Sequence, residues 1–266
     1  LGDLVGPERC ARQLDHRPAL VLDRRHLGGD ALGELAEPRE LLPEADERMH
    51  DLDERRVPRP LLDRLGRGPL LADGAMGTQL YARGIGFDQS FDGLNLTRAT
   101  IVEAVHRDYL AAGAELIETN TFGCNEGRRA PHELADKVRL IARQGVKVAR
   151  AAREIVGVNA FVAGSIGPLG KPLEPFGNIP IAEAERHFRA TVEGLLEGGC
   201  DCLILETFQD LTEVLAALRA ARRVTLDLPI IAQMTYGQDG KTLYGHTPTL
   251  AVKALKQAGA DVVGVN

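Results

Sequence analysis

The sequence contains no tryptophan, and aromatic residues make up only 4% of its 266 residues. Basic residues are not in excess either, because 32 Lys and Arg stand against 38 Asp and Glu, which gives a formal net charge of −6. A chain with this balance lacks the basic surface by which proteins usually bind nucleic acid or anionic membranes. We therefore expect neither kind of partner.

Long apolar runs are missing as well. The longest uncharged stretch, 155–170, has only 16 residues, and four of them are glycine. It is too short and too polar to span a bilayer, and the N-terminus has no apolar core of a signal peptide. Four cysteines in a chain of this length do not form a disulfide framework. The sequence therefore predicts a protein of the reducing cytoplasm.

Residues 1–66 lack most of what a hydrophobic core requires, since Phe, Tyr and Ile are absent along with Lys, Ser, Thr and Asn. The segment holds 26 charged residues and six prolines, and proline interrupts helices. Two interpretations stay open. The segment is either a disordered natural extension or non-native sequence translated upstream of the true start, because the chain begins with Leu1 and its first methionine is Met49. We place the domain boundary between residues 66 and 67.

Residues 67–266 show short apolar runs that alternate with longer amphipathic stretches. The runs are predicted strands, at 69–72, 115–119, 161–165, 202–206, 229–234 and 261–265. Two of the amphipathic stretches, 100–112 and 210–223, place apolar residues on one helical face. Thr100 and Glu103 have the spacing of a capping box, and Thr247-Pro248 has that of a helix start.

A small repeat supports this alternation of strands and helices. Similar glycine-containing turns at 112–115, 198–201 and 258–261 each join a helix to an apolar run. At least six strand–helix units favour a parallel α/β fold, and their number favours a (β/α)₈ TIM barrel over a doubly wound sheet. No G-x-G-x-x-G follows the first strand, which weakens the dinucleotide-binding alternative. We expect a TIM barrel with about six of its eight βα units in this chain.

A polar residue follows each predicted strand. These residues are Asp73, Glu118 with Asn120, Ser165, Glu206, Gln233 and Asn266. The chemistry of such barrels takes place at the C-terminal ends of the strands, so these side chains are expected around one mouth. Two carboxylates, Asp73 and Glu206, suit either acid–base chemistry or the binding of an ammonium group. Gly74 and Gly77, just after Asp73, let the backbone approach a ligand closely.

Five motifs carry a resemblance to a known family. They are LLADGAMGT at 70–78, ETNTF at 118–122, GSIGP at 164–168, ETF at 206–208 and VGVN at 263–266. In this order and spacing they resemble the homocysteine-binding domain of the homocysteine S-methyltransferase family. That domain is found in the N-terminal module of cobalamin-dependent methionine synthase and in bacterial fusions with methylenetetrahydrofolate reductase. The resemblance covers residues 67–266 and implies a TIM barrel that binds homocysteine and methylates its sulfur to give methionine.

The resemblance also implies roles for particular residues. Asp73 and Glu206 would bind the substrate ammonium, while the Gly74 backbone, Asn120 and Ser165 would contact or shape the amino-acid end. The family uses a Zn²⁺ ion held by three cysteine thiolates, and a coordinating thiol is deprotonated outright.

The first of those cysteines would follow Asn266, the last residue, and the other two would lie further on. We therefore expect no metal ligand and no catalytic residue within this chain. The methyl donor stays open, since methylcobalamin, a methylated folate and S-methylmethionine all remain possible. Besides homocysteine, the expected partner is a methyl donor or a domain that carries it.

The cysteines present do not suggest a replacement metal site. Cys200 and Cys202 have a tempting spacing, but both lie where a helix leads into a strand, at the end of the barrel opposite the mouth, and we expect them to be packed. Cys124 is at the mouth end, where we expect a neutral replacement for a small residue, and Cys10 is expected to be incidental. None of the seven histidines forms an i, i+4 pair.

Two other functions remain as alternatives. A Schiff-base lyase or aldolase would need a lysine at a strand end, and Lys171, Lys241, Lys253 and Lys256 are predicted in loops or helices. The second alternative is a non-catalytic amino-acid-binding remnant that retains the mouth without the zinc cysteines.

Overall fold

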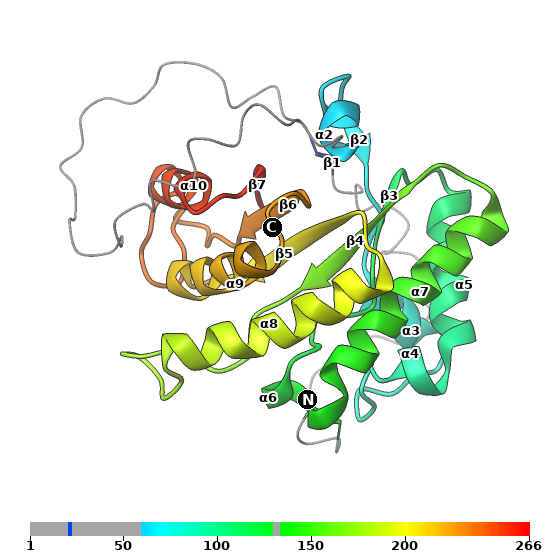
Figure 1. Ribbon diagram of the computed structural model, residues 1–266, viewed down its shortest axis with the longest axis horizontal. Coiled ribbons are helices and arrows are strands. Elements are labelled where there is room, and N and C mark those ends of the chain that lie inside the picture. Colours follow the sequence, from blue (N-terminus) through cyan, green and yellow to red (C-terminus); the bar gives the residue numbers. More distant parts are fainter. Residues whose placement is uncertain (1–20, 23–59, 130–133) are drawn as a thin grey trace, which may run out of the picture.

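The computed structural model describes residues 21–22, 60–129 and 134–266. Its centre is a parallel sheet of five strands that follow one another in chain order (Figure 1). These strands are β3 Leu116–Glu118, β4 Phe161–Ile166, β5 Cys202–Phe208, β6 Ile230–Met234 and β7 Val262–Val265. Before them comes β2, Leu70–Leu71, and a parallel bridge from Ala72 to Leu116 adds this segment beside β3. The prediction of a partial TIM barrel is confirmed.

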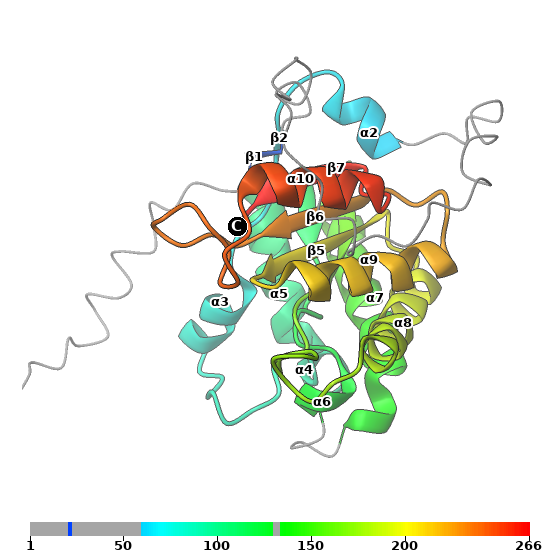
Figure 2. The ribbon, with the colours of Figure 1, turned by 90° about the vertical axis from the view of Figure 1, so that its left-hand side faces the viewer.

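Helices follow the strands and cover the outer face of this curved sheet (Figures 1 and 2). The long ones are α5 Ala99–Ala111, α7 Val138–Val156, α8 Ile181–Gly198, α9 Leu211–Val224 and α10 Pro248–Gln257. Shorter pieces are α3 Met76–Ala82, α4 Leu94–Thr97, α6 Glu126–Arg129 and the 3₁₀ turn Ala135–Lys137. Of the helices described, none combines the length and the apolar character that crossing a membrane requires.

Alternation along the strands produces two separate apolar cores. Successive strand residues point to opposite faces, so every second side chain enters the interior of the barrel. The inner core includes Leu70, Ala72, Leu116, Ala163, Cys202, Ile204, Ile231 and Val262. The intervening residues, among them Ile117, Val162, Leu203, Leu205, Ile230 and Ala232, pack outward against the helices. The barrel is therefore filled from within by one small apolar layer, as expected for this fold.

The short helix α2, Pro60–Leu65, precedes β2 and covers the inner core at the end of the barrel where the strands begin. It buries Leu61, Leu62 and Leu65 against the inner residues. The two-residue strand β1, Val21–Leu22, pairs antiparallel with β2. The packed chain thus begins before the expected boundary at residue 67, and α2 is a helix that the composition of residues 1–66 did not predict. The rest of that segment, including Cys10, lies outside the described residues.

The helix starts agree with one of the two predicted caps, since Thr247 accepts from the Leu250 N–H at 3.4 Å with proline at the next position. Asp210 is a further cap that the sequence analysis did not identify, and it accepts from the Thr212 N–H at 2.8 Å. The capping box predicted from Thr100 does not form. Helix α5 already begins at Ala99, since α4 leads almost directly into it, and its N-cap residue makes no side-chain cap bond. Thr100 therefore lies inside the first turn.

Acidic residues in the repeated glycine turns connect neighbouring strands at the end of the barrel where the strands begin. Asp201 Oδ2, just before β5, accepts from the Val162 N–H of β4 at 2.8 Å and from Arg153 Nη1 at 2.8 Å. Arg153 also donates to the Ala160 carbonyl at 2.9 Å. One carboxylate thus connects the start of β5, the start of β4 and the end of α7.

The same arrangement recurs two strands later. Asp261 Oδ2, before β7, accepts from the Ile230 N–H of β6 at 2.9 Å and from Arg222 Nη2 of α9 at 2.5 Å. Glu115, before β3, forms a two-pronged ion pair with Arg64 of α2, with N–O distances of 2.9 and 2.7 Å. The repeat seen in the sequence is therefore a structural clamp, repeated where strands begin.

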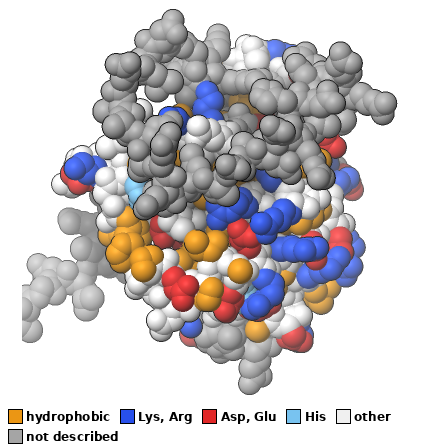
Figure 3. Space-filling view, turned by 60° about the vertical axis from the view of Figure 1, so that its left-hand side comes forward, with side chains coloured by type: hydrophobic (Ala, Val, Ile, Leu, Met, Phe, Trp, Pro, Cys, Tyr) orange, Lys and Arg blue, Asp and Glu red, His pale blue; other side chains and the backbone are white. Residues whose placement is uncertain are grey.

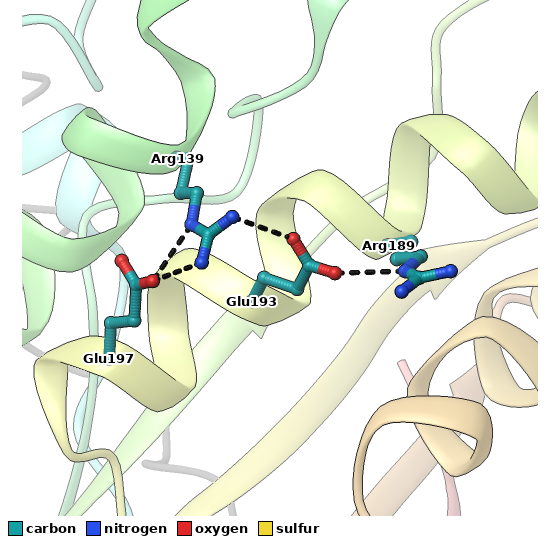
Figure 4. Close-up of polar contacts among 4 residues, drawn as sticks. All are labelled: Arg139, Arg189, Glu193 and Glu197. Carbon is teal, nitrogen blue, oxygen red and sulfur yellow. Dashed lines mark hydrogen bonds and ion pairs between the residues drawn. The ribbon is translucent and has the colours of Figure 1, made fainter.

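Ion pairs on the outer surface connect α7 and α8 more loosely. Figure 4 shows Arg139 of α7 between Glu193 and Glu197 of α8, with Arg189 also donating to Glu193. On the face shown in Figure 3, basic and acidic side chains are likewise interspersed. Exposed pairs of this kind contribute little to stability. Close packing of these two helices depends instead on Gly194, where a Cβ would lie 2.4 Å from the Arg139 carbonyl oxygen.

We predict that Asp201→Ala destabilises the protein more than Glu197→Ala does. The first change leaves the Val162 N–H and the Arg153 guanidinium without their shared acceptor, which costs about 1.5–3 kcal/mol for hydrogen bonds to a charged group. The second removes an exposed pair and should cost about 0–1 kcal/mol. Urea unfolding of both variants measures the difference, and equal losses would contradict the clamp.

Candidate functional site

A cavity of about 860 Å³ opens at the C-terminal ends of the strands. It brings together every strand-end residue that the sequence singled out: Asp73, Gly74, Glu118, Asn120, Ser165, Glu206, Gln233 and Asn266. The loop from α3 to α4 contributes Phe87 and Phe91, and α6 contributes Arg128 at the rim. The predicted mouth therefore exists as one concave site.

Strand alternation explains why four of these residues form the floor of the cavity. Each stands two positions after an apolar residue of the inner core and so points into the barrel. The pairs are Leu116 and Glu118, Ala163 and Ser165, Ile204 and Glu206, and Ile231 and Gln233. The inner side chains thus change from apolar to polar one layer below the opening.

Asp73 is buried beside this floor, with 6% of its surface exposed. Its Oδ2 accepts from the Glu118 N–H at 3.0 Å, whereas Oδ1 has no hydrogen-bond partner among the described residues. Burial raises the pKa of the Asp73 carboxyl well above its usual value, and the nearby charge of Glu206 raises it further. The unpaired oxygen makes Asp73 an acceptor that lacks a donor.

Glu118 is a functional candidate that the sequence placed at the mouth without a role. Burial raises the pKa of its carboxyl well above the usual value, and the charges of Glu206 and Asp73 add to this. A hydrogen bond between Glu118 and Glu206 acts on this pKa in the same direction. Three carboxyl groups close together in one mouth repel one another when ionised. The mouth therefore favours a cation.

The backbone around Glu206 is irregular at the point where this residue lines the mouth. The pairing of β5 with β6 shifts register between Leu205 and Phe208, and Thr207 has a φ of 61°, a left-handed conformation that is rare for a β-branched residue. Ser165 Oγ donates to Glu206 Oε1 at 2.5 Å. Thr207 Oγ1 lies 3.4 Å from Glu206 Oε2. The carboxylate is therefore fixed by neighbours on two sides.

Asn120 shapes the mouth through its own hydrogen bonds. Its Nδ2 donates to the Phe91 carbonyl at 2.7 Å and to Asn95 Oδ1 at 3.1 Å. Asn95 returns a bond to the Asn120 carbonyl at 2.8 Å. Both amide hydrogens of Asn120 are thus used to hold the loop that carries Phe91. Asn95 escaped the sequence reasoning because a residue inside a short helix gives no strand-end signal.

The position of Gly74 requires glycine because the side chain of Tyr109 packs against it, in addition to any approach of a ligand to the backbone. A Cβ at this position would lie 3.0 Å from the hydroxyl oxygen of Tyr109, which donates to the Ala75 carbonyl at 3.1 Å. Tyr109 thereby holds the turn that follows Asp73, and a side chain at Gly74 would displace it. The backbone beside Asp73 consequently stays open to the cavity.

The described cysteines do not fit the three-thiolate zinc site that the family resemblance implies. Cys200 and Cys202 are buried at the start of β5, away from the mouth, and burial raises the pKa of the Cys200 thiol to about 12. Cys124 is buried and donates from Sγ to the Val138 carbonyl at 3.3 Å. Within the described ranges, no group of three or more His, Cys, Asp or Glu side chains is arranged to hold a metal.

Of the residues that the structure describes, no histidine or lysine adds a catalytic group to the mouth. His106 is fully buried in α5, where burial lowers its pKa to about 4, and His187 is paired with Glu126 at 2.9 Å. His246 lies near Thr242 in a loop. None of the four lysines considered for a Schiff base lines the described cavity, where Arg128 is the basic residue.

Comparison with known proteins agrees with this geometry. The family described as homocysteine S-methyltransferase matches residues 70–266. Methionine synthase of Mycobacterium tuberculosis is 34% identical over 235 residues, which cover 84% of this chain and 19% of that protein. Methionine synthase of Mycobacterium leprae is 33% identical over 219 residues, covering 77% and 18%. The chain thus spans about a fifth of the length of these curated relatives.

A solved structure shows the same fold. The crystal structure of the homocysteine methyltransferase MmuM from Escherichia coli, in its metallated form, superposes with a TM-score of 0.67 and 26% sequence identity. The match covers 78% of this chain and 77% of that one. The match to the M. tuberculosis relative covers a larger share of this chain than residues 67–266 make up, so the similarity extends before residue 67.

We predict that Glu118→Gln stabilises the protein at pH 8 and has no effect on stability near pH 4. Because folding raises the pKa of this carboxyl, the folded state loses stability as the pH rises from the unfolded value through the folded one. Glutamine keeps a hydrogen-bond donor toward Glu206 but does not titrate. The difference in Tm between variant and wild type should therefore grow with pH.

Thermal unfolding at several pH values between 4 and 8 measures this difference. Glu154→Gln, on an exposed part of α7, is the matched control and should show no such growth. A constant difference for Glu118→Gln across the range would contradict the raised pKa of this carboxyl.

Proposed function

Because the chain belongs to the homocysteine S-methyltransferase family, we propose that its mouth binds homocysteine and presents the sulfur for methylation to methionine. The observation that carries the proposal is the group of three carboxyls at the mouth, formed by the buried Asp73 and the partly buried Glu118 and Glu206, with one unpaired acceptor atom on Asp73 among the described residues. Such a group suits the ammonium of an amino acid, which supplies three N–H donors and a positive charge.

The ammonium is bound between Asp73 and Glu206. Asp73 Oδ1 accepts one of its protons, which gives a partner to the atom that has none among the described residues. Glu206, held by Ser165 at 2.5 Å, accepts another from the facing strand. Gly74 leaves the backbone beside Asp73 accessible, and Asn120 keeps the Phe91 loop in place through its bond of 2.7 Å. Binding thus fixes the amino-acid end at the floor.

Methylation forms a bond between sulfur and the methyl carbon, while the bond from that carbon to its donor breaks and the thiol proton leaves. In the family this is the chemistry that Zn²⁺ supports when it is bound by three thiolates. The described cysteines do not offer such a site, so no step is assigned to a metal held by them. The residues of the mouth bind and orient the substrate. Their contacts do not identify the methyl donor, for which a methylated folate and a cobalamin are both candidates. A cytoplasmic location remains part of the proposal.

One alternative function uses the same mouth. An amino-acid-binding module without methyl transfer would need Asp73, Ser165 and Glu206 but no zinc. The observation that favours it is that Cys124, Cys200 and Cys202 are each buried and form no joint metal site within the described part of the chain.

We predict that Glu206→Gln weakens homocysteine binding by about 1.5–3 kcal/mol, because a neutral amide replaces the carboxyl group that accepts from the ammonium. Titration calorimetry of the wild type and the variant measures this loss. Glu197→Gln, on the outer face of α8, provides the control and should bind like the wild type. An unchanged affinity for Glu206→Gln would refute the assignment.

We also predict that the chain with this sequence retains far less than one zinc per molecule after dialysis against a weak chelator. Its described thiols are buried and separate, so they cannot form the three-thiolate site. Metal analysis by plasma mass spectrometry tests this. Stoichiometric zinc that disappears in Cys124→Ser or Cys202→Ser would show that these thiols do bind metal.

A further inference from the structure

Gln233 lies at the floor of the mouth in a position that neither the motifs nor the proposed ammonium site explain. It stands on β6, two residues after Ile231 of the inner core, and only 2% of its surface is exposed. Its side chain lines the cavity, yet its Nε2 is buried with no hydrogen-bond partner among the described residues. A buried amide without a partner is rare in folded proteins and destabilises them.

The surroundings of Gln233 show that the amide is not needed for packing. On one side stands Gly264 of β7, its register partner, where a Cβ would lie 3.5 Å from Gln233 Cγ and 3.7 Å from Nε2. On the other side is β5, whose irregular stretch carries Glu206. An unbranched apolar side chain of the same length would fill this space without leaving a donor unpaired. The amide therefore points to a ligand.

The mouth thus contains two unpaired buried atoms of opposite character. Asp73 Oδ1 is an acceptor without a donor, and Gln233 Nε2 is a donor without an acceptor, among the residues that the structure describes. An α-amino acid carries its ammonium and its carboxylate on the same carbon atom. A donor on the strand next to Glu206 is therefore positioned for the carboxylate of a ligand whose ammonium Glu206 binds. An ionised oxygen is also the strongest acceptor for an amide N–H.

Resting on the proposed function, we propose that Gln233 is a specificity-determining residue whose side-chain amide donates to the α-carboxylate of the bound amino acid. The site then accepts zwitterions and discriminates against amines that have the same thiol chain but no carboxylate. Sites built to hydrogen-bond a ligand group discriminate strongly against analogues that lack it, because their own buried groups are then left unpaired.

Titration calorimetry of the whole chain and its Gln233→Met variant with three ligands tests this proposal. Homocysteine carries an ammonium, a carboxylate and a thiol. Of the other two ligands, 3-aminopropane-1-thiol lacks the carboxylate, and 2-aminobutyrate lacks the sulfur. We expect Gln233→Met to weaken homocysteine and 2-aminobutyrate by roughly 10- to 100-fold and to leave 3-aminopropane-1-thiol within about 2-fold. The wild type should prefer homocysteine to the amine thiol by a similar factor, and the variant should lose this preference.

Thermal unfolding of the same proteins separates ligand binding from a structural role. If the amide serves a ligand, Gln233→Met should raise the Tm of the unliganded protein, because it removes an unpaired buried donor. A lower Tm together with equal weakening of all three ligands would overturn the proposal in favour of a structural role. Gln257→Met makes the same chemical change at the exposed end of α10 and should alter neither Tm nor affinity.

Three further outcomes distinguish this inference from the proposed function. If the wild type binds homocysteine and Gln233→Met binds it equally well, the assignment of Gln233 is wrong and the proposed function stands. The assignment is also wrong if the variant loses 3-aminopropane-1-thiol but not 2-aminobutyrate, since Gln233 would then contact the sulfur. If the wild type binds none of the three ligands, the proposed function fails and this inference fails with it.

Discussion

The alternation of side chains along parallel strands that surround one axis is the constraint on which this structure depends. It sends every second residue into a narrow interior, where only a small apolar layer fits. Two residues further along each strand, the same geometry places Glu118, Ser165, Glu206 and Gln233 on the floor of the mouth. The site is therefore fixed mainly by strand register, and loops such as the one held by Asn120 complete its rim.

The two ends of the barrel differ in how well their polar groups are satisfied. At the end where the strands begin, Asp201 and Asp261 each accept from a backbone N–H of the neighbouring strand and from an arginine of a neighbouring helix. At the mouth, Thr207 has a strained backbone, and Asp73 and Gln233 each keep a buried atom unpaired within the described part of the chain. Stabilising contacts at one end offset the cost of a site that is destabilising while empty, a division typical of these barrels.

How far the sequence predicted this arrangement depended on whether a feature had a local pattern. The apolar strands and the polar residues after them were found because buried strands appear in the sequence as short apolar runs, each followed by a polar residue. Helix α2, at 60–65, was missed because its three leucines do not stand out in a segment dominated by charged residues and proline. The strain at Thr207 and the bond from Asn95 to Asn120 arise only from tertiary packing. Glu118 and Gln233 were visible as strand-end residues, but hydrogen-bond partners cannot be read from spacing.

The charges of the mouth restrict what it can hold more narrowly than its volume does. The carboxyls of the mouth repel an anion, and burial together with neighbouring negative charge raises the pKa of Asp73 and of Glu118. The basic residue Arg128 stands at the rim, where its Nε donates to the Pro168 carbonyl at 3.1 Å and its guanidinium lies over Phe122. A purely cationic ligand would leave the donor of Gln233 unpaired, and a purely anionic one would leave Asp73 unpaired. A ligand with both charges close together would satisfy the two atoms at once. In the proposed site, the atoms that make the empty barrel less stable are thus the ones that would favour a zwitterion.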